Sequence, residues 1–211
     1  MASAQVDKAT KKHVSADVRR ELLVAAALRV MKRDGIAAAT TRAICAEADM
    51  PHGAFHYCFR GKRELYAALL STDINITLDA AWPGITPEAE PVENIRMLLR
   101  AYWSAVETDP EAQLVLSELV NLALREPELS GLPAWEHRAY LDKTVSYLER
   151  FTDEACLELT VDTRVLAEMI NSVVSGVISF WLSHRDNGTV VETLDNFAAL
   201  LATLTRPRRK V

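Results

Sequence analysis

The clearest pattern in the chain is the return of apolar residues at spacings of three and four. Within residues 17–33 the apolar positions share one side of a helix and the basic positions share the other. The apolar positions are Leu23, Ala26, Ala27 and Val30. Ser15 or Asp17 is suited to cap the start of this helix, and Gly35 is suited to end it. Residues 17–33 are therefore predicted to form an amphipathic helix.

Two short helices and a longer one follow, at 41–48, 51–58 and 62–78, with Thr40 as a cap for the first. Residues 82–91 hold three prolines and a glycine and predict a loop. Beyond it the pattern predicts five helices, at 92–108, 111–125, 133–157, 162–185 and 190–204. No strand-like alternation interrupts them. The sequence therefore predicts an all-α fold of about nine helices.

Composition narrows the class of protein. No stretch approaches about 18 consecutive apolar residues, so no membrane span is expected. The first twenty residues are polar and do not resemble a secretory signal, which favours the cytoplasm. The three cysteines form no CxxC pair, as is usual in a reducing compartment.

Charge divides the chain into two parts. Residues 1–70 contain 12 Lys and Arg against 7 Asp and Glu, whereas the remaining 141 residues contain 12 against 22. A basic N-terminal part on an acidic body favours contact between that part and a polyanion, although chance variation between two solvated surfaces gives the same numbers. Lys8, Lys11 and Lys12 form a basic arm in this part, and the chain ends in a basic tail.

The two short helices around residues 40–59 indicate a helix-turn-helix. Neither persists alone in water, because helices of this length are marginal without packing partners. Their apolar residues allow them to pack on each other and on helix 17–33, which leaves the second helix free to enter a DNA major groove. These apolar residues are Ile44, Ala48, Met50, Phe55 and Phe59.

Residues 17–70 resemble the N-terminal domain of the TetR family of bacterial transcriptional regulators. The resemblance rests on ten residues at the family's spacing: Gly35, Thr40, Ile44, Cys45, Ala48, Gly53, Phe55, Phe59, Lys62 and Leu65. It implies a three-helix DNA-binding domain, a helical domain that binds a small molecule, and a homodimer. The rest of the chain resembles the family only in its helical pattern and length.

Three positions depart from the family pattern. Asp49 replaces the glycine of the turn, and aspartate tolerates left-handed backbone geometry better than most residues. His56 replaces a phosphate-binding tyrosine, so the neighbouring Tyr57 is a candidate for part of that role. Pro51 replaces a capping serine and removes one backbone donor. These changes affect the predicted operator contacts and leave the predicted fold unchanged.

Roles on DNA follow from the chemistry of each group. Thr40 and Thr41 begin a helix, where hydroxyls and free N–H groups bind phosphate, and Lys62 supplies a point charge for a second phosphate. His52 and Ala54 suit base edges, by a hydrogen bond and by contact with a thymine methyl. The full predicted DNA-binding set is Thr40, Thr41, Arg42, His52, Gly53, Ala54, His56, Tyr57 and Lys62.

A metal site is the alternative for part of this segment, because Cys45, His52, His56 and Cys58 lie close in sequence. Their spacing matches no standard zinc pattern, and the histidines occupy the expected DNA face. We therefore expect no metal and no cofactor.

The acidic part is predicted to hold a small-molecule cavity and a dimer surface. Large apolar walls with a few polar groups suit a small, largely apolar effector, although such residues are more often plain core. The candidate cavity residues are Tyr102, Trp103, Leu116, Glu118, Asn121, Tyr140, Tyr147, Met169 and Val173. The apolar faces of the last two helices predict a four-helix bundle across a two-fold axis, and the alternative is that these faces pack inside one subunit. The candidate dimer residues are Ile170, Val174, Val177, Trp181, Leu194, Phe197 and Leu201.

The sequence thus predicts a basic arm at 1–16, a DNA-binding domain at 17–62, an effector-binding and dimerisation domain at 63–205, and a basic tail at 206–211. The function expected is that of a repressor that a small effector releases from a palindromic operator on double-stranded DNA. Two alternatives are a small helical enzyme or carrier and a protein-binding adaptor. No nucleophile–base pair, metal set or phosphate loop supports an enzyme.

Overall fold

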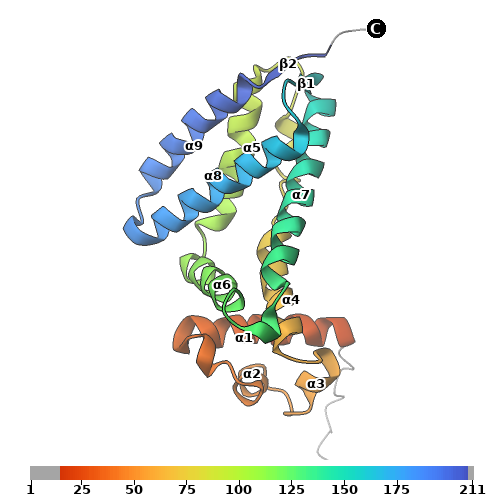
Figure 1. The fold of residues 1–211 in the computed structure, drawn as a ribbon, viewed down its shortest axis with the longest axis vertical. Coiled ribbons are helices and arrows are strands. Elements are labelled where there is room, and N and C mark those ends of the chain that lie inside the picture. Colours follow the sequence, from red (N-terminus) through yellow and green to blue (C-terminus); the bar gives the residue numbers. More distant parts are fainter. Residues whose placement is uncertain (1–14, 209–211) are drawn as a thin grey trace, which may run out of the picture. The chain divides into compact units, whose positions relative to one another are not determined.

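The computed structural model describes residues 15–208 of the 211-residue chain. This part is mostly helical and divides into two compact units between Lys62 and Arg63 (Figure 1). The all-α class is confirmed, and the described residues hold the nine expected α-helices, with two very short strands besides. The lysines of the predicted basic arm lie outside the described residues.

The first unit contains α1 (Ala16–Asp34), α2 (Thr41–Glu47) and α3 (Ala54–Cys58). The Ser15 hydroxyl caps α1 by accepting a hydrogen bond from the Val18 N–H at 3.2 Å. Gly35, at φ 82°, ends the helix in a region that glycine enters freely. Both boundaries agree with the sequence prediction to within one residue.

The three helices of this unit pack on one another, and α1 contacts both short helices. Ile44 of α2, Phe55 of α3 and Phe59 just after it are each about 1% exposed. The Phe55 and Phe59 rings lie 5.4 Å apart between centroids, and the Arg20 guanidinium lies 4.2 Å from the Phe59 ring centroid. Burial of these side chains, at about 1.5–3 kcal/mol each, stabilises helices too short to form alone.

The second unit contains the remaining six helices. Proline in the first turn starts three of them, because its fixed φ suits a helix and its missing N–H has no helical acceptor there. The helices are α4 (Lys62–Ile74), α5 (Pro91–Val106), α6 (Pro110–Ala123), α7 (Leu132–Glu154), α8 (Thr163–His184) and α9 (Asn187–Ala202).

Three predicted boundaries in this unit are wrong by three or more residues. Helix α7 ends at Glu154 and not at residue 157, where strand β1 (Leu157–Leu159) begins. Helix α4 ends at Ile74 and not at Leu78, and the chain then turns before Trp82. Helix α9 begins at Asn187 and not at residue 190, because the Asp186 carboxylate accepts a hydrogen bond from the Thr189 N–H at 3.2 Å and caps the helix earlier.

The chain end is also different from the prediction. Strand β2 (Thr205–Pro207) pairs antiparallel with β1 (Leu157–Leu159), so the described part of the tail is not a free basic segment. Arg206 pairs with Glu158 at 2.6 Å, and Arg208 pairs with Asp153 at 2.8 Å. Strands of three residues are too short to show alternation in a sequence, which explains why none was predicted.

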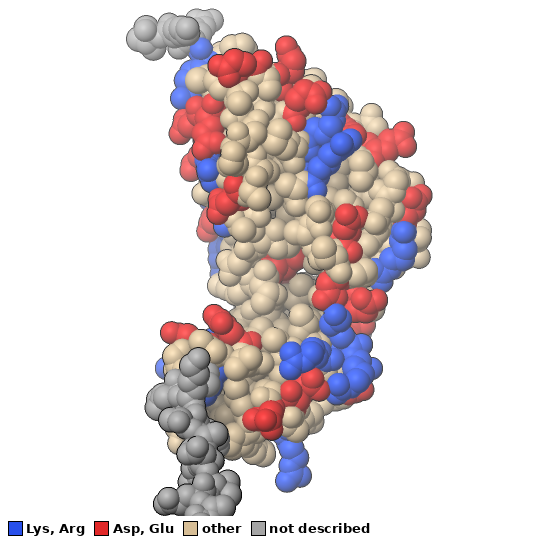
Figure 2. Space-filling model, turned by 180° about the vertical axis from the view of Figure 1, so that it is seen from behind, with Lys and Arg blue, Asp and Glu red and all other residues tan. Residues whose placement is uncertain are grey.

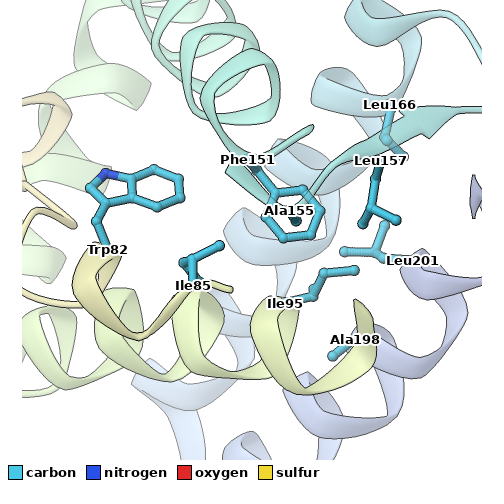
Figure 3. Close-up of a cluster of buried hydrophobic side chains, with 9 residues drawn as sticks. All are labelled: Trp82, Ile85, Ile95, Phe151, Ala155, Leu157, Leu166, Ala198 and Leu201. Atoms are coloured by element: carbon cyan, nitrogen blue, oxygen red, sulfur yellow. The ribbon is translucent and has the colours of Figure 1, made fainter. Parts of the chain in front are cut away.

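Two apolar clusters hold the second unit together. In the first, residues of α5, α7, α8 and α9 converge with β1 and the loop before α5 (Figure 3). Its members include Ile95, Phe151, Leu157, Leu166 and Leu201, all labelled in that view. The predicted loop 82–91 is therefore anchored, since Trp82 is only 3% exposed and belongs to the same cluster.

The second cluster lies where α5, α8 and α9 meet. Trp103 and Trp181 form an edge-to-face pair with centroids 4.9 Å apart. The Trp181 indole N–H donates to the Asn187 side-chain oxygen at 2.6 Å, and the Asn187 amide donates to Glu107 at 2.7 Å. These contacts fix the hairpin of α8 and α9 against α5, which lies beside α9 in Figure 1.

Candidate DNA-binding surface and effector cavity

The turn between α2 and α3 has the geometry of a helix-turn-helix. The Thr40 hydroxyl accepts a hydrogen bond from the Ala43 N–H at 3.1 Å and so caps α2 as predicted. Asp49 follows α2 at φ 52°, which confirms that aspartate occupies the left-handed turn position. The Met50 N–H donates to the Cys45 carbonyl at 2.9 Å and closes the turn. The backbone is thus set by local contacts before α3 begins.

Helix α3 is shorter than predicted. Pro51, His52 and Gly53 form a turn in which the Ala54 N–H donates to the Pro51 carbonyl at 2.8 Å, and the helix starts at Ala54. His52 therefore lies in the turn before the helix and not on the helix itself. Its ring still stacks with that of His56, with centroids 6.1 Å apart and 18° between the planes. The two imidazoles form one polar surface.

The predicted DNA-binding side chains lie on the outside of the first unit. Burial of Phe55 and Phe59 turns the intervening residues outward, and Tyr57 is 88% exposed. Thr41 and Ala54 are half-buried, whereas the other seven are exposed: Thr40, Arg42, His52, Gly53, His56, Tyr57 and Lys62. These positions are compatible with contact to a large partner, and no partner is present to test them.

Acidic side chains neutralise part of the positive charge in this unit. Glu47 pairs with Arg29 at 2.8 Å and with Arg33 at 3.0 Å, and hydrogen bonds from these two guanidinium groups hold the pKa of Glu47 below its usual value. Arg42 and Lys62 take part in none of the ion pairs found among residues 15–208. They are therefore available to an external anion.

The metal alternative gains no support in this segment. Cys45 is buried and donates to the His52 carbonyl oxygen at 3.5 Å. Within residues 15–208, no group of three or more His, Cys, Asp or Glu side chains is arranged to hold a metal ion.

The second unit contains a cavity of about 640 Å³ between α4, α5, α6, α7 and α8. Its walls are mainly apolar, with Ile74, Leu99, Leu116, Leu148 and Ile178 among them. This volume lies within the 300–1,000 Å³ typical of small-molecule sites, and an apolar wall with few polar groups is their usual composition.

One end of the cavity is polar and acidic. The Asp73 side chain, on α4, is 9% exposed, and its two oxygens accept hydrogen bonds from different helices. The Gln113 amide of α6 donates to one oxygen at 2.8 Å, and the Tyr140 hydroxyl of α7 donates to the other. Three helices are thus joined through one buried carboxylate that lines the cavity.

Burial and the charge of Asp73 change the acidity of the neighbouring groups. Burial, assisted by the Asp73 charge, raises the pKa of Glu136 to about 7 and raises the pKa of the Tyr102 and Tyr140 hydroxyls above its ordinary value. Both tyrosines therefore remain neutral donors at physiological pH. Glu136, also at the cavity wall, is divided between its acid and its carboxylate near neutral pH.

Another part of the wall carries neutral hydrogen-bonding groups. The Tyr147 hydroxyl donates to the Ile76 carbonyl at 3.1 Å, and the Thr144 hydroxyl donates to the Asn171 side-chain oxygen at 2.7 Å. The Asn171 amide nitrogen is buried with no acceptor among the described residues, so it is free to donate to a bound molecule.

The structure places five of the nine predicted cavity residues at this wall: Tyr102, Leu116, Asn121, Tyr140 and Tyr147. The other four were wrongly placed. Trp103 packs against Trp181 in the apolar cluster, and Glu118 is exposed away from the cavity. Met169 and Val173 lie in a shallow groove beside Phe197, on another face of α8.

Sequence reasoning missed Asp73, Gln113 and Glu136. A signal was present for the first, because Asp73 falls three and four residues after the buried Leu70 and Leu69. An acid on the apolar face of a helix is rare unless it has a partner or a function. Glu136 had no such signal, since α7 is polar along much of its length.

The predicted dimer residues fall into two groups. Trp181, Leu194 and Leu201 are at most 5% exposed within one subunit, so they are core residues and not a dimer surface. Ile170, Val174, Val177 and Phe197 are half-buried. The exposed large apolar residues of these helices are instead Val165, Met169, Phe180 and Leu200.

Helix α8 is apolar and yet poorly covered. By length and composition alone, Thr163–His184 could cross a membrane. The lengths of the consecutive apolar stretches in the sequence did not predict this. Only 17% of the most apolar window of the helix is buried. In the structure α8 packs on α6, α7 and α9 within the second unit. Figure 2 shows uncharged areas on one face of the molecule, with acidic and basic side chains between them.

Comparison with known proteins agrees with this architecture. Residues 23–69 match the sequence model described as "Bacterial regulatory proteins, tetR family". The chain is 30% identical over 131 residues to the HTH-type nicotine-responsive transcriptional repressor HdnoR of Paenarthrobacter nicotinovorans. The N-terminal unit of this chain therefore belongs to the TetR family. The alignment with HdnoR covers 62% of this chain and 66% of the repressor, just under two thirds of its length.

Two solved structures share the fold of this chain over most of its length. A TetR-family transcriptional regulator of Mesorhizobium loti superposes with a TM-score of 0.71 at 16% identity, covering 92% of this chain and 99% of that one. The multidrug binding protein EbrR, solved with imidazole, gives a TM-score of 0.61 at 24% identity, covering 87% and 94%. The matched family and HdnoR are transcriptional regulators and not enzymes.

Proposed function

We propose that this TetR-family protein is a homodimeric repressor that binds a palindromic operator and is released by a small effector in the 640 Å³ cavity. The observation that carries the proposal is the first unit, in which buried Phe55 and Phe59 hold an exposed helix-turn-helix. The nicotine-responsive repressor supports ligand response in a relative. A regulator of this kind works in the cytoplasm, which we propose as its location.

On the operator, phosphate and base contacts divide between two groups of residues. Thr40, Arg42 and Lys62 suit phosphates, through a hydroxyl at a helix start and two unpaired cations. His52 and His56 form the stacked surface that faces outward from the turn and α3, and they suit base edges in the major groove. Tyr57, highly exposed, supplies a further hydroxyl for the backbone.

The exposed faces of α8 and α9 are proposed to form the dimer interface. Val165, Met169 and Phe180 are spaced by four and eleven residues, which places them on one side of α8, and they are 45–74% exposed. Contiguous exposed apolar residues mark an interaction site in a soluble protein. Arg164 and Glu168 lie next to this face, so a second copy suits it better than lipid does.

The effector acts in this proposal by shifting the dimer between two conformations. Two half-sites lie one helical turn apart, about 34–36 Å. A dimer binds both well only when its two helix-turn-helix units have the matching separation. An effector that prefers another conformation lowers DNA affinity by its differential affinity for the two states.

Selection of duplex DNA from a random library tests the proposal. We expect enrichment of an inverted repeat, bound as a dimer, with affinity that falls steeply as salt rises because the protein releases phosphate counterions. No enrichment, or binding that does not depend on salt, would favour an adaptor or a carrier instead.

Analytical ultracentrifugation tests the interface. Phe180→Glu is expected to give monomers at concentrations where the wild type is dimeric, because it buries a charge in an apolar interface. Leu124→Glu is the matched control, since Leu124 is 68% exposed and lies just after α6, outside the proposed interface. A dimeric Phe180→Glu variant would contradict the proposed interface.

A further inference from the structure

The acidic end of the cavity is chemically unusual. Asp73 is a carboxylate removed from water, yet its oxygens accept hydrogen bonds only from the neutral Gln113 amide and Tyr140 hydroxyl. None of the ion pairs found among residues 15–208 involves Asp73. A buried carboxylate without a cation is costly, because neutral donors replace only part of its lost hydration.

A second acid faces the same space. Glu136 lines the cavity one helical turn before Tyr140 on α7, and the charge of Asp73 raises its pKa, which places the two carboxyl groups within electrostatic reach. Tyr102 and Tyr140 supply aromatic surface at the same end. Two carboxyl groups with aromatic rings provide what a positively charged nitrogen needs in place of water.

We propose that the effector is a lipophilic organic cation, an amine or quaternary ammonium whose charge lies between Asp73 and Glu136 and whose apolar body fills the rest of the cavity. The inference rests on the proposed function, because it names the class of molecule that the regulator senses. The apolar wall of Leu99, Leu116 and Leu148 excludes a small hydrated cation and accommodates a hydrocarbon body.

The other charged groups at the wall do not cancel this acidic end. The Lys143 ammonium lies 4.9 Å from the Tyr147 ring centroid, two helical turns from Glu136 on α7. His137 pairs with Glu168 at 3.4 Å, and both are about half exposed. A hydrogen bond from Thr144 leaves the buried Asn171 amide free, so it can donate to a neutral polar group on the ligand body.

Isothermal titration calorimetry on the full-length protein without DNA tests the charge preference. Three probes of similar shape are compared: phenylbutylammonium, phenylbutanol and phenylbutanoate. We expect the cation to bind at least about tenfold more tightly than the alcohol, because a charge-assisted interaction in a buried site exceeds a neutral one by that amount. The anion is expected to bind least tightly. Equal affinities, tighter binding of the alcohol or the anion, or no binding of the cation would overturn the proposal.

Asp73→Asn tests whether the preference for the cation over the alcohol arises in the cavity. The asparagine retains an oxygen for Gln113 and a polar partner for Tyr140, so we expect the fold to persist and the cation to lose about tenfold or more in affinity. The alcohol should change by less than about threefold, since it has no charge to lose. Unchanged affinity for the cation would place its site elsewhere and overturn the proposal.

Glu136→Gln gives a second reading if Asp73→Asn fails to fold. It is expected to lower the affinity for the cation by about threefold to tenfold and to leave the affinity for the alcohol unchanged. Glu149→Gln is the matched control, because the same chemical change is made at an exposed carboxylate of the same helix that does not line the cavity. Equal effects of the two glutamine variants would contradict the assigned role of Glu136.

DNA binding separates this inference from the proposed function. A protein that selects an operator but prefers the alcohol or the anion remains a regulator of another ligand class. A protein that binds the cation through Asp73 but selects no DNA keeps the cavity assignment and loses the repressor proposal.

Discussion

The DNA-binding surface and the cavity hold their polar side chains in opposite ways. Tyr57 is 88% exposed and lies on a short helix whose apolar neighbours fix it from beneath. Asp73 is 9% exposed and lies on the buried face of a longer helix, bonded to two others. The first arrangement depends only on packing within the small first unit. The second requires three helices of the second unit to be correctly placed against one another.

This difference has an energetic consequence. Exposed side chains such as Arg42 and Tyr57 contribute little to folding, so they vary at small cost when a regulator acquires a new operator. Asp73 reduces stability unless Gln113 and Tyr140 remain in place, because its carboxylate is removed from water. Binding surfaces and cavities should therefore respond to mutation in different measurements.

The largest expected effect distinguishes a residue of α3 that supports the fold from one that contacts DNA. Phe55→Ala removes a ring that is 1% exposed, and it should destabilise the first unit by about 3–5 kcal/mol, measured by chemical unfolding. Tyr57→Ala, two residues away, should change stability by less than about 0.5 kcal/mol and still weaken DNA binding. Loss of stability in the Tyr57 variant would mean that this ring supports the fold.

Most of the fold could be predicted because it depends on local signals. Helix starts coincide with side-chain caps such as Ser15 and Thr40 and with first-turn prolines, and these act within one turn. The failures were non-local. The strand pair between residues 157–159 and 205–207 joins segments nearly fifty residues apart, and neither segment carries a pattern of its own.

The sites divide in the same way. The position of the turn at Asp49 followed from its neighbours, whereas the wall of the cavity depends on which faces of five helices converge. Trp103 and Tyr102 are adjacent in sequence, yet one packs in a core cluster and the other lines the cavity. Residue type alone cannot separate them, because both are large aromatic side chains on an amphipathic helix.

Within the DNA surface, two substitutions should separate affinity from specificity. Lys62→Ala is expected to weaken binding to every sequence by a similar factor and to lower the slope of log affinity against log salt by roughly one. His52→Ala should cost about 1–3 kcal/mol on the selected operator and much less on other sequences. Binding measured over a salt series on both DNAs gives the answer, and equal losses for the two variants would contradict these roles.

In the cavity, Glu136→Gln should stabilise the empty protein at alkaline pH. The folded-state pKa of about 7 lies above the ordinary value, so folding takes up a proton and stability falls as pH rises from about 4.5 to 7. Glutamine does not titrate, so Glu136→Gln should raise the free energy of unfolding by about 1 kcal/mol at pH 8, after allowance for partial solvation. At pH 4.5 it should change it little. Thermal unfolding at both pH values measures it. His137→Gln is the control for the adjacent imidazole, and a gain from Glu136→Gln that is equal at both pH values would argue against burial as its cause.

The smallest effect concerns the turn that joins α2 and α3 of the helix-turn-helix. Asp49 occupies the left-handed region at φ 52°, where a side chain costs energy that glycine does not pay. Asp49→Gly should therefore stabilise the first unit by about 0.5 kcal/mol, because relief of strain is partly offset by the greater backbone entropy of glycine in the unfolded chain. Asp49→Ala should destabilise it by about 1 kcal/mol, since alanine has neither the conformational freedom of glycine nor a side-chain acceptor for the local backbone. Denaturant unfolding of the three proteins gives both differences. A glycine variant less stable than the wild type would show that the aspartate side chain stabilises this turn by more than the strain costs.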